Sequence, residues 1–429
     1  VCLNIGCIPA KALLHTADLL EETRAGKRFG VVAEQVTLDW AAAQKQKGQV
    51  VRQMTSGVGS LMKKNAIDVH TGAARITKPG SVQVTDGDGK QTDLAAANVI
   101  VATGARPKDL PGIGATIDEE RILSSTGALE LKEVPASLLI VGAGAIGVEF
   151  ASMYRAFGSE VTLIEMLPRI VPGEDEEISA ELAKSLASRG IKILTDARLE
   201  RVERDDSGVT ASVTDDAGKG QRLTAERLLL GVGIVPNTED LGLEEAGVSR
   251  DPRGFIQVDG MMQSSAPGIY AIGDCVPTPW LAHVASAEGI IAVERIAGRQ
   301  PPPLNYDIVP SCTYCSPEVA SAGLTEAEAV ERGYEVKVGR FPFAANGKAS
   351  ILGQRSGFVK IVAEARFDQV LGVHLIGPRV TEMIAEAGVA LSHEATAESL
   401  MRTVHAHPTL YEALGEAEHA AAEGAAIHI

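Results

Sequence analysis

Two cysteines at the start of the chain have the spacing of a reactive pair. They are Cys2 and Cys7 in the segment Cys-Leu-Asn-Ile-Gly-Cys. Thiols separated by four residues can be bridged only where the local helix is distorted, and Gly6 makes that distortion easier. Such a constrained bridge is readily reduced, and Pro9 fits the first turn of a helix whose N-terminus favours a thiolate. By spacing alone, a structural or metal-binding role for the two cysteines stays open.

A second group of reactive side chains lies near the other end of the chain, in His405-Ala-His407-Pro-Thr-Leu-Tyr-Glu412. A dithiol must lose a proton before it attacks a disulfide, and histidine is the side chain suited to this near neutral pH. Glu412 lies five residues beyond His407, close enough to hold the other ring nitrogen and stabilise the imidazolium. Taken alone, two histidines beside a proline are more often surface or structural residues than catalytic ones.

The third motif is a glycine-rich loop between a strand and a helix. A buried apolar strand at 138–141 runs into Gly142, Gly144 and Gly147, after which an apolar helix begins. This context is what a dinucleotide fingerprint requires, since the glycines allow a tight turn, approach of the pyrophosphate and close helix packing. Glu165 ends the next strand, where a carboxylate accepts hydrogen bonds from a ribose diol and repels a 2′-phosphate. The loop therefore predicts NAD rather than NADP; a glycine-rich turn without a nucleotide is the alternative.

The elements around these motifs indicate a duplicated domain. An apolar strand running into Gly-x-x-Pro occurs twice, at 99–107 and at 228–236. In the second copy, 91 residues separate Gly142 from Gly233. The same distance counted back from the first copy reaches Leu13, where no glycine-rich loop stands. We therefore expect the loop of the first copy to lie before residue 1.

Periodicity predicts the remaining elements. Helices are expected at 12–25 and 39–64, the second capped by Asp39, and Pro301-Pro-Pro303 marks a boundary. Beyond it, a distinct α+β domain is predicted from strands at 336–341, 359–363 and 370–376 and helices at 380–392 and 396–404. The tail after Glu416 is expected to form a helix and then a short strand.

Composition excludes several classes of protein. The net charge of −16 over 429 residues argues against binding to nucleic acid or anionic membranes, which needs a basic surface. No apolar stretch approaches the length of a bilayer span. Five cysteines are too few and too unevenly placed for a secreted disulfide scaffold. A cytoplasmic location is expected, with the mitochondrial matrix as the alternative.

Three tempting features are interpreted as structural. Cys312-Thr-Tyr-Cys315 has the spacing of a zinc ligand pair but lacks a second pair, so two buried small side chains are expected. Cys275 is expected to be structural as well. The acidic run at 174–177 is interpreted as the solvated start of a helix.

Together the motifs resemble the pyridine nucleotide-disulfide oxidoreductases, and within them the dihydrolipoamide dehydrogenases. The matching segments, in order, are Cys-Leu-Asn-Ile-Gly-Cys-Ile-Pro-Ala-Lys, Ala-Thr-Gly, Gly-Ala-Gly-Ala-Ile-Gly-Val-Glu, Ile-Tyr-Ala-Ile-Gly-Asp, Leu-Ala-His and His-Ala-His-Pro-Thr-Leu-Tyr-Glu. The resemblance implies an α/β fold with two Rossmann-like domains, for FAD and NAD, and a C-terminal α+β dimerisation domain. The implied domains are FAD-binding at 1–113 (without its N-terminal part), NAD-binding at 114–240, a return to the FAD-binding and central domain at 241–307, and an interface domain at 308–429.

The resemblance also assigns roles to residues. The catalytic residues would be Cys2, Cys7, Lys11, Glu149, His407 and Glu412. FAD would be contacted by Lys11, Gly72, Thr103, Gly104, Asp274, Leu281, Ala282 and His283. NAD would be contacted by Gly142, Gly144, Gly147, Glu165, Leu199 and Gly233.

The implied reaction is FAD-dependent oxidation of protein-bound dihydrolipoamide to lipoamide, with reduction of NAD⁺ to NADH. Cys2 would be the interchange thiol that exchanges with the substrate, Cys7 would lie against the flavin, and Lys11 would sit nearby and pair with Glu149. His407, contributed by the partner subunit of a homodimer, would be the base. The partners would be the lipoyl domains of a 2-oxo-acid dehydrogenase or glycine cleavage complex.

Departures from the family pattern keep alternatives open. The family's first glycine-rich loop, which cradles the FAD phosphates, is absent from this sequence. A related disulfide reductase is one alternative, although glutathione reductase usually has a basic residue at the position of Glu165. A non-catalytic NAD-binding or scaffold protein is the alternative from a different class.

Overall fold

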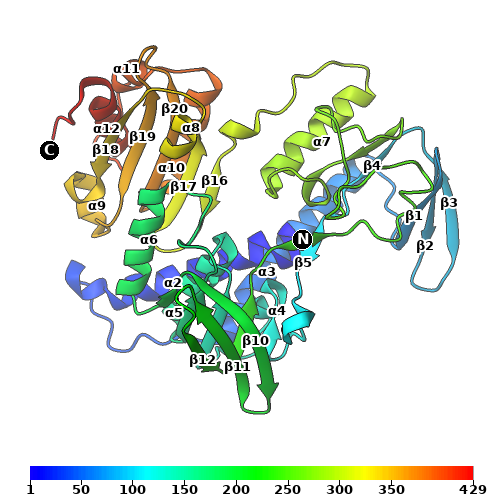
Figure 1. Ribbon diagram of the computed structural model, residues 1–429, viewed down its shortest axis with the longest axis horizontal. Helices are drawn as coiled ribbons and strands as arrows, with labels where there is room; N and C mark the ends of the chain where they lie inside the picture. The colour runs from blue at the N-terminus through cyan, green and yellow to red at the C-terminus, as the bar shows by residue number, and fades with distance from the viewer. Residues whose placement is uncertain (429) are drawn as a thin grey trace. The chain divides into compact units, whose positions relative to one another are not determined.

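The computed structural model describes residues 1–428, and the chain divides into two compact units. The first unit comprises Val1–Cys7, Gln49–Lys108 and Gly233–Tyr306. The second unit comprises Ile8–Gly48, Asp109–Val232 and the chain from Asp307 onward. Each unit is therefore assembled from three separate stretches of sequence, as the colours in Figure 1 show.

Short strands and one long helix form most of the first unit. Its strands are β1 (Ala73–Lys78), β2 (Ser81–Thr85) and β3 (Gln91–Ala95) in one antiparallel sheet, β4 (Val99–Val101) parallel to β15 (Ile269–Ala271), and β5 (Ala105–Pro107) antiparallel to β14 (Ile234–Pro236). Its helices are α1 (Cys2–Ile5), α7 (Ala282–Ile296) and the part of α3 (Trp40–Lys64) from residue 49 to residue 64. The two similar segments seen in the sequence meet here, because β5 and β14 are their paired ends.

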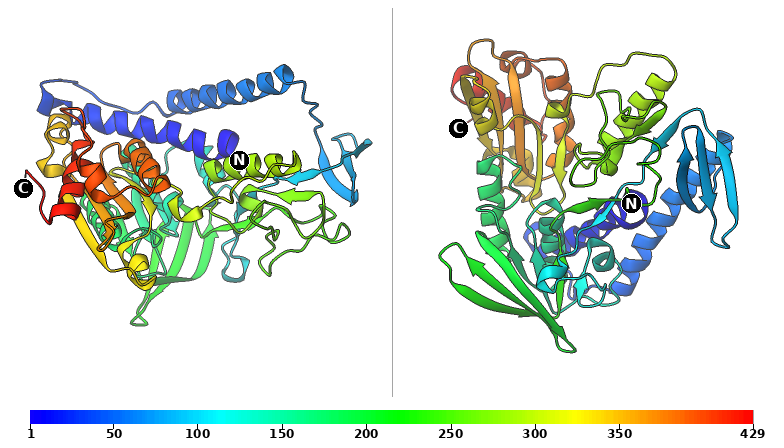
Figure 2. Two further views of the ribbon diagram at one scale, coloured as in Figure 1. Left: turned by 90° about the horizontal axis from the view of Figure 1, so that it is seen from above. Right: turned by 45° about the vertical axis from the view of Figure 1, so that its right-hand side comes forward.

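Two long helices follow the first cysteine in the sequence. They are α2 (Cys7–Arg24) and α3 (Trp40–Lys64), the blue helices of Figure 2. The side chain of Asp39 accepts the N–H of Ala42 at 2.9 Å, which confirms the predicted cap of α3. On α2, Leu13 is completely buried in the core of the second unit.

The middle of the second unit is a parallel sheet with the order β6-β13-β7-β8-β9. Its strands and helices are β6 (Ile122–Leu123), α4 (Ser125–Leu129), β7 (Ser137–Val141), α5 (Ala145–Phe157), β8 (Glu160–Ile164), α6 (Glu176–Ser188), β9 (Lys192–Leu194) and β13 (Arg227–Leu230). An antiparallel sheet of β10 (Ala197–Asp205), β11 (Gly208–Asp215) and β12 (Gly220–Ala225) is inserted before β13. A parallel sheet whose glycine loop joins β7 to α5 is the Rossmann arrangement that the sequence predicted.

The C-terminal part of the second unit is an antiparallel sheet with the order β16-β17-β20-β19-β18. Its elements are β16 (Ser311–Thr313), β17 (Glu318–Gly323), α8 (Glu326–Glu331), β18 (Val336–Pro342), α9 (Gly347–Leu352), β19 (Phe358–Glu364), β20 (Val370–Gly377), α10 (Val380–Ser392), α11 (Ala397–Met401) and α12 (Glu412–Glu423). Helix α10 packs on β17 and β20, and α12 packs on β18 and β19 (Figure 1). The predicted α+β domain is confirmed, but the short strand expected after the last helix is absent from residues 424–428.

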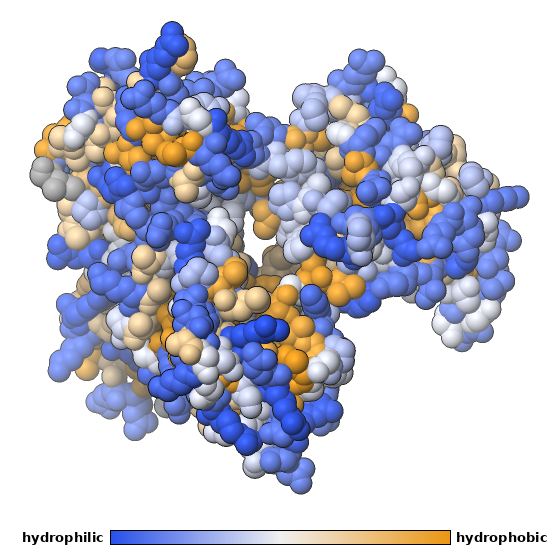
Figure 3. Space-filling view, in the orientation of Figure 1, coloured by the Kyte–Doolittle hydropathy of each residue, from blue (hydrophilic) through white to orange (hydrophobic). Residues whose placement is uncertain are grey.

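Hydrophilic residues cover most of the face shown in Figure 3, with apolar residues in patches among them. Within residues 1–428, no helix is long and apolar enough to cross a membrane.

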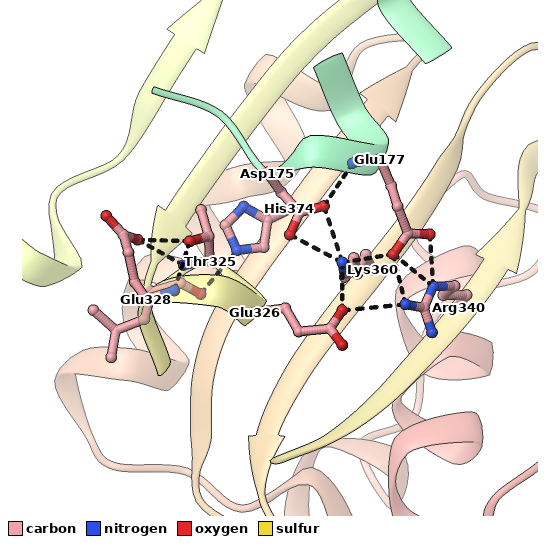
Figure 4. Close-up of polar contacts among 9 residues, drawn as sticks. Asp175, Glu177, Thr325, Glu326, Glu328, Arg340, Lys360 and His374 are labelled. Carbon is pink, nitrogen blue, oxygen red and sulfur yellow. Dashed lines mark hydrogen bonds and ion pairs between the residues drawn. The ribbon is translucent and has the colours of Figure 1, made fainter. Parts of the chain in front are cut away.

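A buried lysine joins the C-terminal sheet to α6. Lys360 on β19 is 2% exposed, and its Nζ lies 2.9 Å from Asp175, 2.7 Å from Glu177 and 2.8 Å from Glu326 (Figure 4). Arg340 on β18 also contacts Glu177, and this hydrogen bond lowers the pKa of Glu177 to about 2. Two cations therefore face three carboxylates in one cluster.

This cluster corrects the interpretation of the acidic run at 174–177. Asp175 does cap α6, accepting the N–H of Glu177 at 3.1 Å, so the run starts a helix as expected. Its solvation was predicted wrongly, because Glu174 and Asp175 are only 7% and 2% exposed. Lys360 supplies the charge that makes burial of Asp175 possible.

Replacing Lys360 with methionine should lower the free energy of unfolding by about 3–5 kcal/mol, because it leaves a buried carboxylate without a cation. Urea titration followed by circular dichroism measures the change. The control is Lys184→Met, whose side chain is 79% exposed and whose effect should stay within about 0.5 kcal/mol. Equal effects of the two substitutions would contradict the importance assigned to the buried cluster.

Candidate active site

The two N-terminal cysteines lie on either side of a helix break. Cys2 begins α1, Gly6 ends it with φ −131° and ψ −112°, and Cys7 is the first residue of α2. A Cβ at Gly6 would lie only 3.2 Å from the Val1 side chain and 3.3 Å from the Val1 carbonyl oxygen, so a glycine suits this break between the helices. Both cysteines are present as thiols, Cys2 half-buried and Cys7 exposed. Cys7 therefore stands at the N-terminus of an 18-residue helix, where the helix dipole favours its thiolate.

Lys11 and Glu149 form an ion pair, as predicted. The Nζ of Lys11 lies 2.9 and 2.8 Å from the two carboxylate oxygens of Glu149, which is 5% exposed. Tyr314, in the turn after β16, completes the group. Its backbone N–H donates to Glu149 at 2.9 Å, and its ring centroid lies 4.6 Å from the Lys11 ammonium. Three distant segments of the second unit thus meet around one buried carboxylate.

The glycine loop between β7 and α5 has the geometry that a pyrophosphate needs. A Cβ at Gly147 would collide with the carbonyl oxygen of Gly142, so α5 packs too closely on the loop for any larger residue. At Gly144, by contrast, a Cβ would meet nothing within 4 Å. Gly144 is also the N-cap of α5, and no side chain caps that end. The first N–H groups of the helix are therefore available to an anion, and the loop fits NAD.

Glu165 is held beside this loop by backbone donors. Its Oε2 accepts the N–H of Ala143 at 2.7 Å, and its Oε1 accepts the N–H of Leu167 at 2.9 Å. The carboxylate follows β8 and is 7% exposed. A fixed negative charge here disfavours a 2′-phosphate, in agreement with the sequence expectation for NAD.

The residues expected at the flavin lie in the first unit, apart from Lys11. The Oγ1 of Thr103 donates to the carbonyl of Asn237 at 2.6 Å, and the N–H of Asn237 donates to the carbonyl of Gly104 at 2.9 Å. Asn237 was not identified from the sequence, although it holds the turn at Gly104, where φ is +67°. For Gly72 the structure gives a packing reason, because a Cβ there would collide with the carbonyl of Thr85.

The N-terminus of α7 contains three more of the residues that are expected to contact the flavin. Leu281 is the N-cap of α7, followed by Ala282 and His283, and no side chain caps this helix. Its first N–H groups can therefore receive an electron-rich ligand atom. Burial raises the pKa of Asp274, and the carboxylate of Glu288 adds to the rise. Glu288 itself is fully buried and accepts the N–H of Gly273 at 2.7 Å. These groups fit FAD.

The expected base has its expected partner. The Nδ1 of His407 lies 2.7 Å from the Oε1 of Glu412, and the histidine side chain is 80% exposed. Burial alone would raise the pKa of Glu412, but the hydrogen bonds from His407 and from the N–H of Thr409 lower it. Glu412 thus stays ionised and leaves the other ring nitrogen, Nε2, for proton transfer at the surface.

Other expected residues are placed as follows. Leu199 is a half-buried residue of β10 in the second unit, and Gly233 precedes β14 in the first unit. Cys315 is 3% exposed and Cys275 is fully buried, as expected for structural thiols, whereas Cys312, also expected to be buried, is only half-buried. Among the described residues, no cluster of side chains could hold a metal ion. A second histidine–carboxylate pair, His405 with Glu386 at 2.7 Å, was not foreseen.

Comparison with known proteins decides the family. Residues 1–289 match the family "Pyridine nucleotide-disulphide oxidoreductase", and residues 309–418 match its dimerisation domain. The chain belongs to the pyridine nucleotide-disulphide oxidoreductase family. A dihydrolipoyl dehydrogenase from Chlorobaculum tepidum is 46% identical over 97% of this chain and 88% of its own length. One from Bacillus subtilis is 45% identical over 100% of this chain and 91% of its own.

Solved structures of the family have the same fold. LpdA from Mycobacterium tuberculosis superimposes with a TM-score of 0.90 at 28% identity, covering 97% of this chain and 90% of its own. The HOCl-induced flavoprotein disulfide reductase RclA from Escherichia coli, in its Cu(II) complex, gives a TM-score of 0.86 at 27% identity, with the same coverage. The fold class expected from the sequence is thereby confirmed.

Replacing Gly144 with alanine should weaken NAD binding at least tenfold while leaving the thermal midpoint unchanged, because the methyl group enters the space that a pyrophosphate would occupy. Isothermal titration with NAD⁺ measures the affinity. Gly173→Ala is the matched control, since a Cβ there also meets nothing within 4 Å. Normal NAD affinity of the Gly144 variant would show that the pyrophosphate does not approach this residue.

Proposed function

We propose that this protein is a dihydrolipoyl dehydrogenase, which oxidises protein-bound dihydrolipoamide and reduces NAD⁺ to NADH through a redox-active disulfide of Cys2 and Cys7. One observation carries the proposal. Relatives named dihydrolipoyl dehydrogenase match 97–100% of the chain at 45–46% identity. The chain also has a thiol pair at a helix start and a histidine held by a carboxylate, which are the groups that dithiol chemistry needs.

The cofactors are FAD and NAD, as expected for the family. When bound, they supply the hydride transfer between the dithiol and the nicotinamide. The protein contributes the glycine loop with Glu165 for NAD. For FAD it contributes the turn at Thr103 and Gly104, the half-buried Asp274 and the uncapped start of α7.

The exchange between the substrate dithiol and the Cys2–Cys7 disulfide proceeds in two steps. A substrate thiolate attacks the Sγ of Cys2, which breaks the disulfide, forms a mixed disulfide and leaves Cys7 as a thiolate. The second substrate thiol, deprotonated by the Nε2 of His407, then attacks the substrate sulfur bound to Cys2. Oxidised lipoamide leaves, and both cysteines are reduced. The two electrons of the dithiol pass on to NAD⁺.

His407 acts in this proposal on the thiols of a second subunit. Its side chain is 80% exposed, and it lies within the segment that matches the family's dimerisation domain. A homodimer places this exposed base at a neighbouring subunit's substrate site.

The proposed partners are the lipoyl domains of a 2-oxo-acid dehydrogenase or glycine cleavage complex, and the proposed location is the cytoplasm. The functional domains are FAD-binding at 1–113 and 241–307, NAD-binding at 114–240 and interface at 308–429.

Replacing Cys2 with serine should abolish oxidation of dihydrolipoamide, because the sulfur that receives the substrate is gone. Reduction of the flavin by NADH should continue, since that step bypasses Cys2. Stopped-flow absorbance of the FAD-loaded enzyme separates the two reactions. Normal lipoamide turnover by this variant would refute the assignment of Cys2.

Replacing His407 with glutamine should lower dihydrolipoamide turnover by about 10²–10⁴-fold, the usual contribution of a general base. The control is His393→Gln, an exposed histidine of the same unit, which should keep wild-type turnover. Steady-state formation of NADH measures both. A loss under tenfold would rule out His407 as the base.

The structural likeness to RclA makes a different disulfide reductase the second candidate. The same assay distinguishes the two functions. An FAD-loaded enzyme that is reduced by NADH but never by dihydrolipoamide would favour the second candidate.

A further inference from the structure

Tyr314 contacts both members of the Lys11–Glu149 ion pair, through different parts of the residue. Its backbone N–H donates to the Oε1 of Glu149 at 2.9 Å. Its ring centroid lies 4.6 Å from the Nζ of Lys11, within the range of a cation–π interaction. One residue therefore fixes the anion with its main chain and the cation with its side chain.

The phenol ring is itself held in place. It interacts with the thiol of Cys312 on β16, where it opposes the rise in the pKa of Cys312 to about 11 that burial and neighbouring carboxylates cause. Burial raises the pKa of Tyr314 to about 12, so the ring stays neutral and its face stays available to a cation. Tyr314 is 36% exposed, a position where an unanchored ring would be mobile.

Lys11 belongs to the same helix as the second redox cysteine. Cys7 and Lys11 are four residues apart on α2, so both side chains lie on one face of that helix, a turn apart. A lysine ammonium near a thiol favours the thiolate. The strength of this effect depends on where the ammonium is held, because the long lysine side chain has several rotamers.

We propose that Tyr314 is a positioning residue, which holds the Lys11 ammonium on the face of α2 that carries Cys7 and so favours the Cys7 thiolate. The inference rests on the proposed function, in which Cys7 leaves as a thiolate. It assigns a role in tuning that thiol to a residue of the C-terminal domain, outside the helix that carries Cys7.

Two substitutions separate the ring from the backbone contact. Tyr314→Leu removes the ring and keeps the N–H that binds Glu149, whereas Tyr314→Phe keeps both the ring face and the N–H. A partly exposed cation–π contact corresponds to about a two- to fivefold change in an equilibrium. Tyr334→Leu is the matched control, since this tyrosine of the same unit is 41% exposed. Tyr314→Met repeats the test should the leucine variant fail to fold.

The first measurement is trace acetylation of lysines in the FAD-loaded enzyme, quantified by mass spectrometry. Lys11 should react about two- to fivefold faster in Tyr314→Leu than in the wild type. The second is the pH dependence of alkylation of Cys7 by iodoacetamide in the reduced enzyme. Its midpoint should rise by about 0.3–0.7 pH unit in Tyr314→Leu, which is the same two- to fivefold change. Tyr314→Phe and Tyr334→Leu should match the wild type in both.

Unchanged acetylation of Lys11 in Tyr314→Leu would overturn the proposal. Faster acetylation with an unchanged alkylation midpoint would overturn the link to Cys7. A shift of equal size in Tyr314→Phe would also contradict it, because the ring face would then not be the cause. Neither measurement uses dihydrolipoamide, so a failure of the proposed lipoamide reaction leaves this test intact.

Discussion

The ion pair of Lys11 with Glu149 is the interaction on which the arrangement of the second unit depends most. It ties the helix that carries a thiol to the helix that follows the glycine loop, and Tyr314 adds the edge of the C-terminal sheet. Because Glu149 is only 5% exposed, its charge is tolerable only with these partners. The redox helix, the nucleotide helix and the dimerisation domain are therefore linked by one carboxylate.

Lys360 plays the corresponding part between the C-terminal sheet and α6. Here the buried cation comes from the C-terminal sheet and the carboxylates come from α6 and α8 (Figure 4). In both places a charge from one element neutralises a charge from another, and the geometry is set by several hydrogen bonds. Such contacts specify one arrangement of the elements, whereas apolar packing alone tolerates several.

Local patterns explain why much of this was predictable. The glycine loop was recognised because strand, spacing and helix all agree at Gly142–Gly147, and α10 was predicted at 380–392, the bounds it has, because its apolar residues repeat at helical spacing. The pair Lys11–Glu149 was expected from the family resemblance, whereas His407–Glu412 was already expected from the spacing of the two residues.

What was missed depends on contacts between residues far apart in the chain. The acidic run at 174–177 has the composition of a solvated helix start, and only Lys360, 185 residues away from Asp175, reverses that interpretation. Tyr314 gave no signal of its own in the sequence. It lies between two cysteines whose spacing drew attention for a different reason. Asn237 likewise acts through its own backbone carbonyl and N–H, which bond to the Thr103 hydroxyl and to the Gly104 carbonyl, and no side-chain pattern reveals this.

The three-part construction of the second unit constrains how the chain can fold during synthesis. One hydrophobic core contains Leu13 from α2, Ile140 from the parallel sheet and Ile376 from β20. This core can therefore be completed only after β20 has been synthesised. Until then, the apolar residues of α2 and β7 lack their contacts with that strand. Proteins with such long-range contacts fold slowly, and during folding they expose hydrophobic surface that is prone to aggregation. The nascent chain therefore leaves apolar surface exposed until its C-terminal segments have been synthesised, which is the condition in which chaperones are needed.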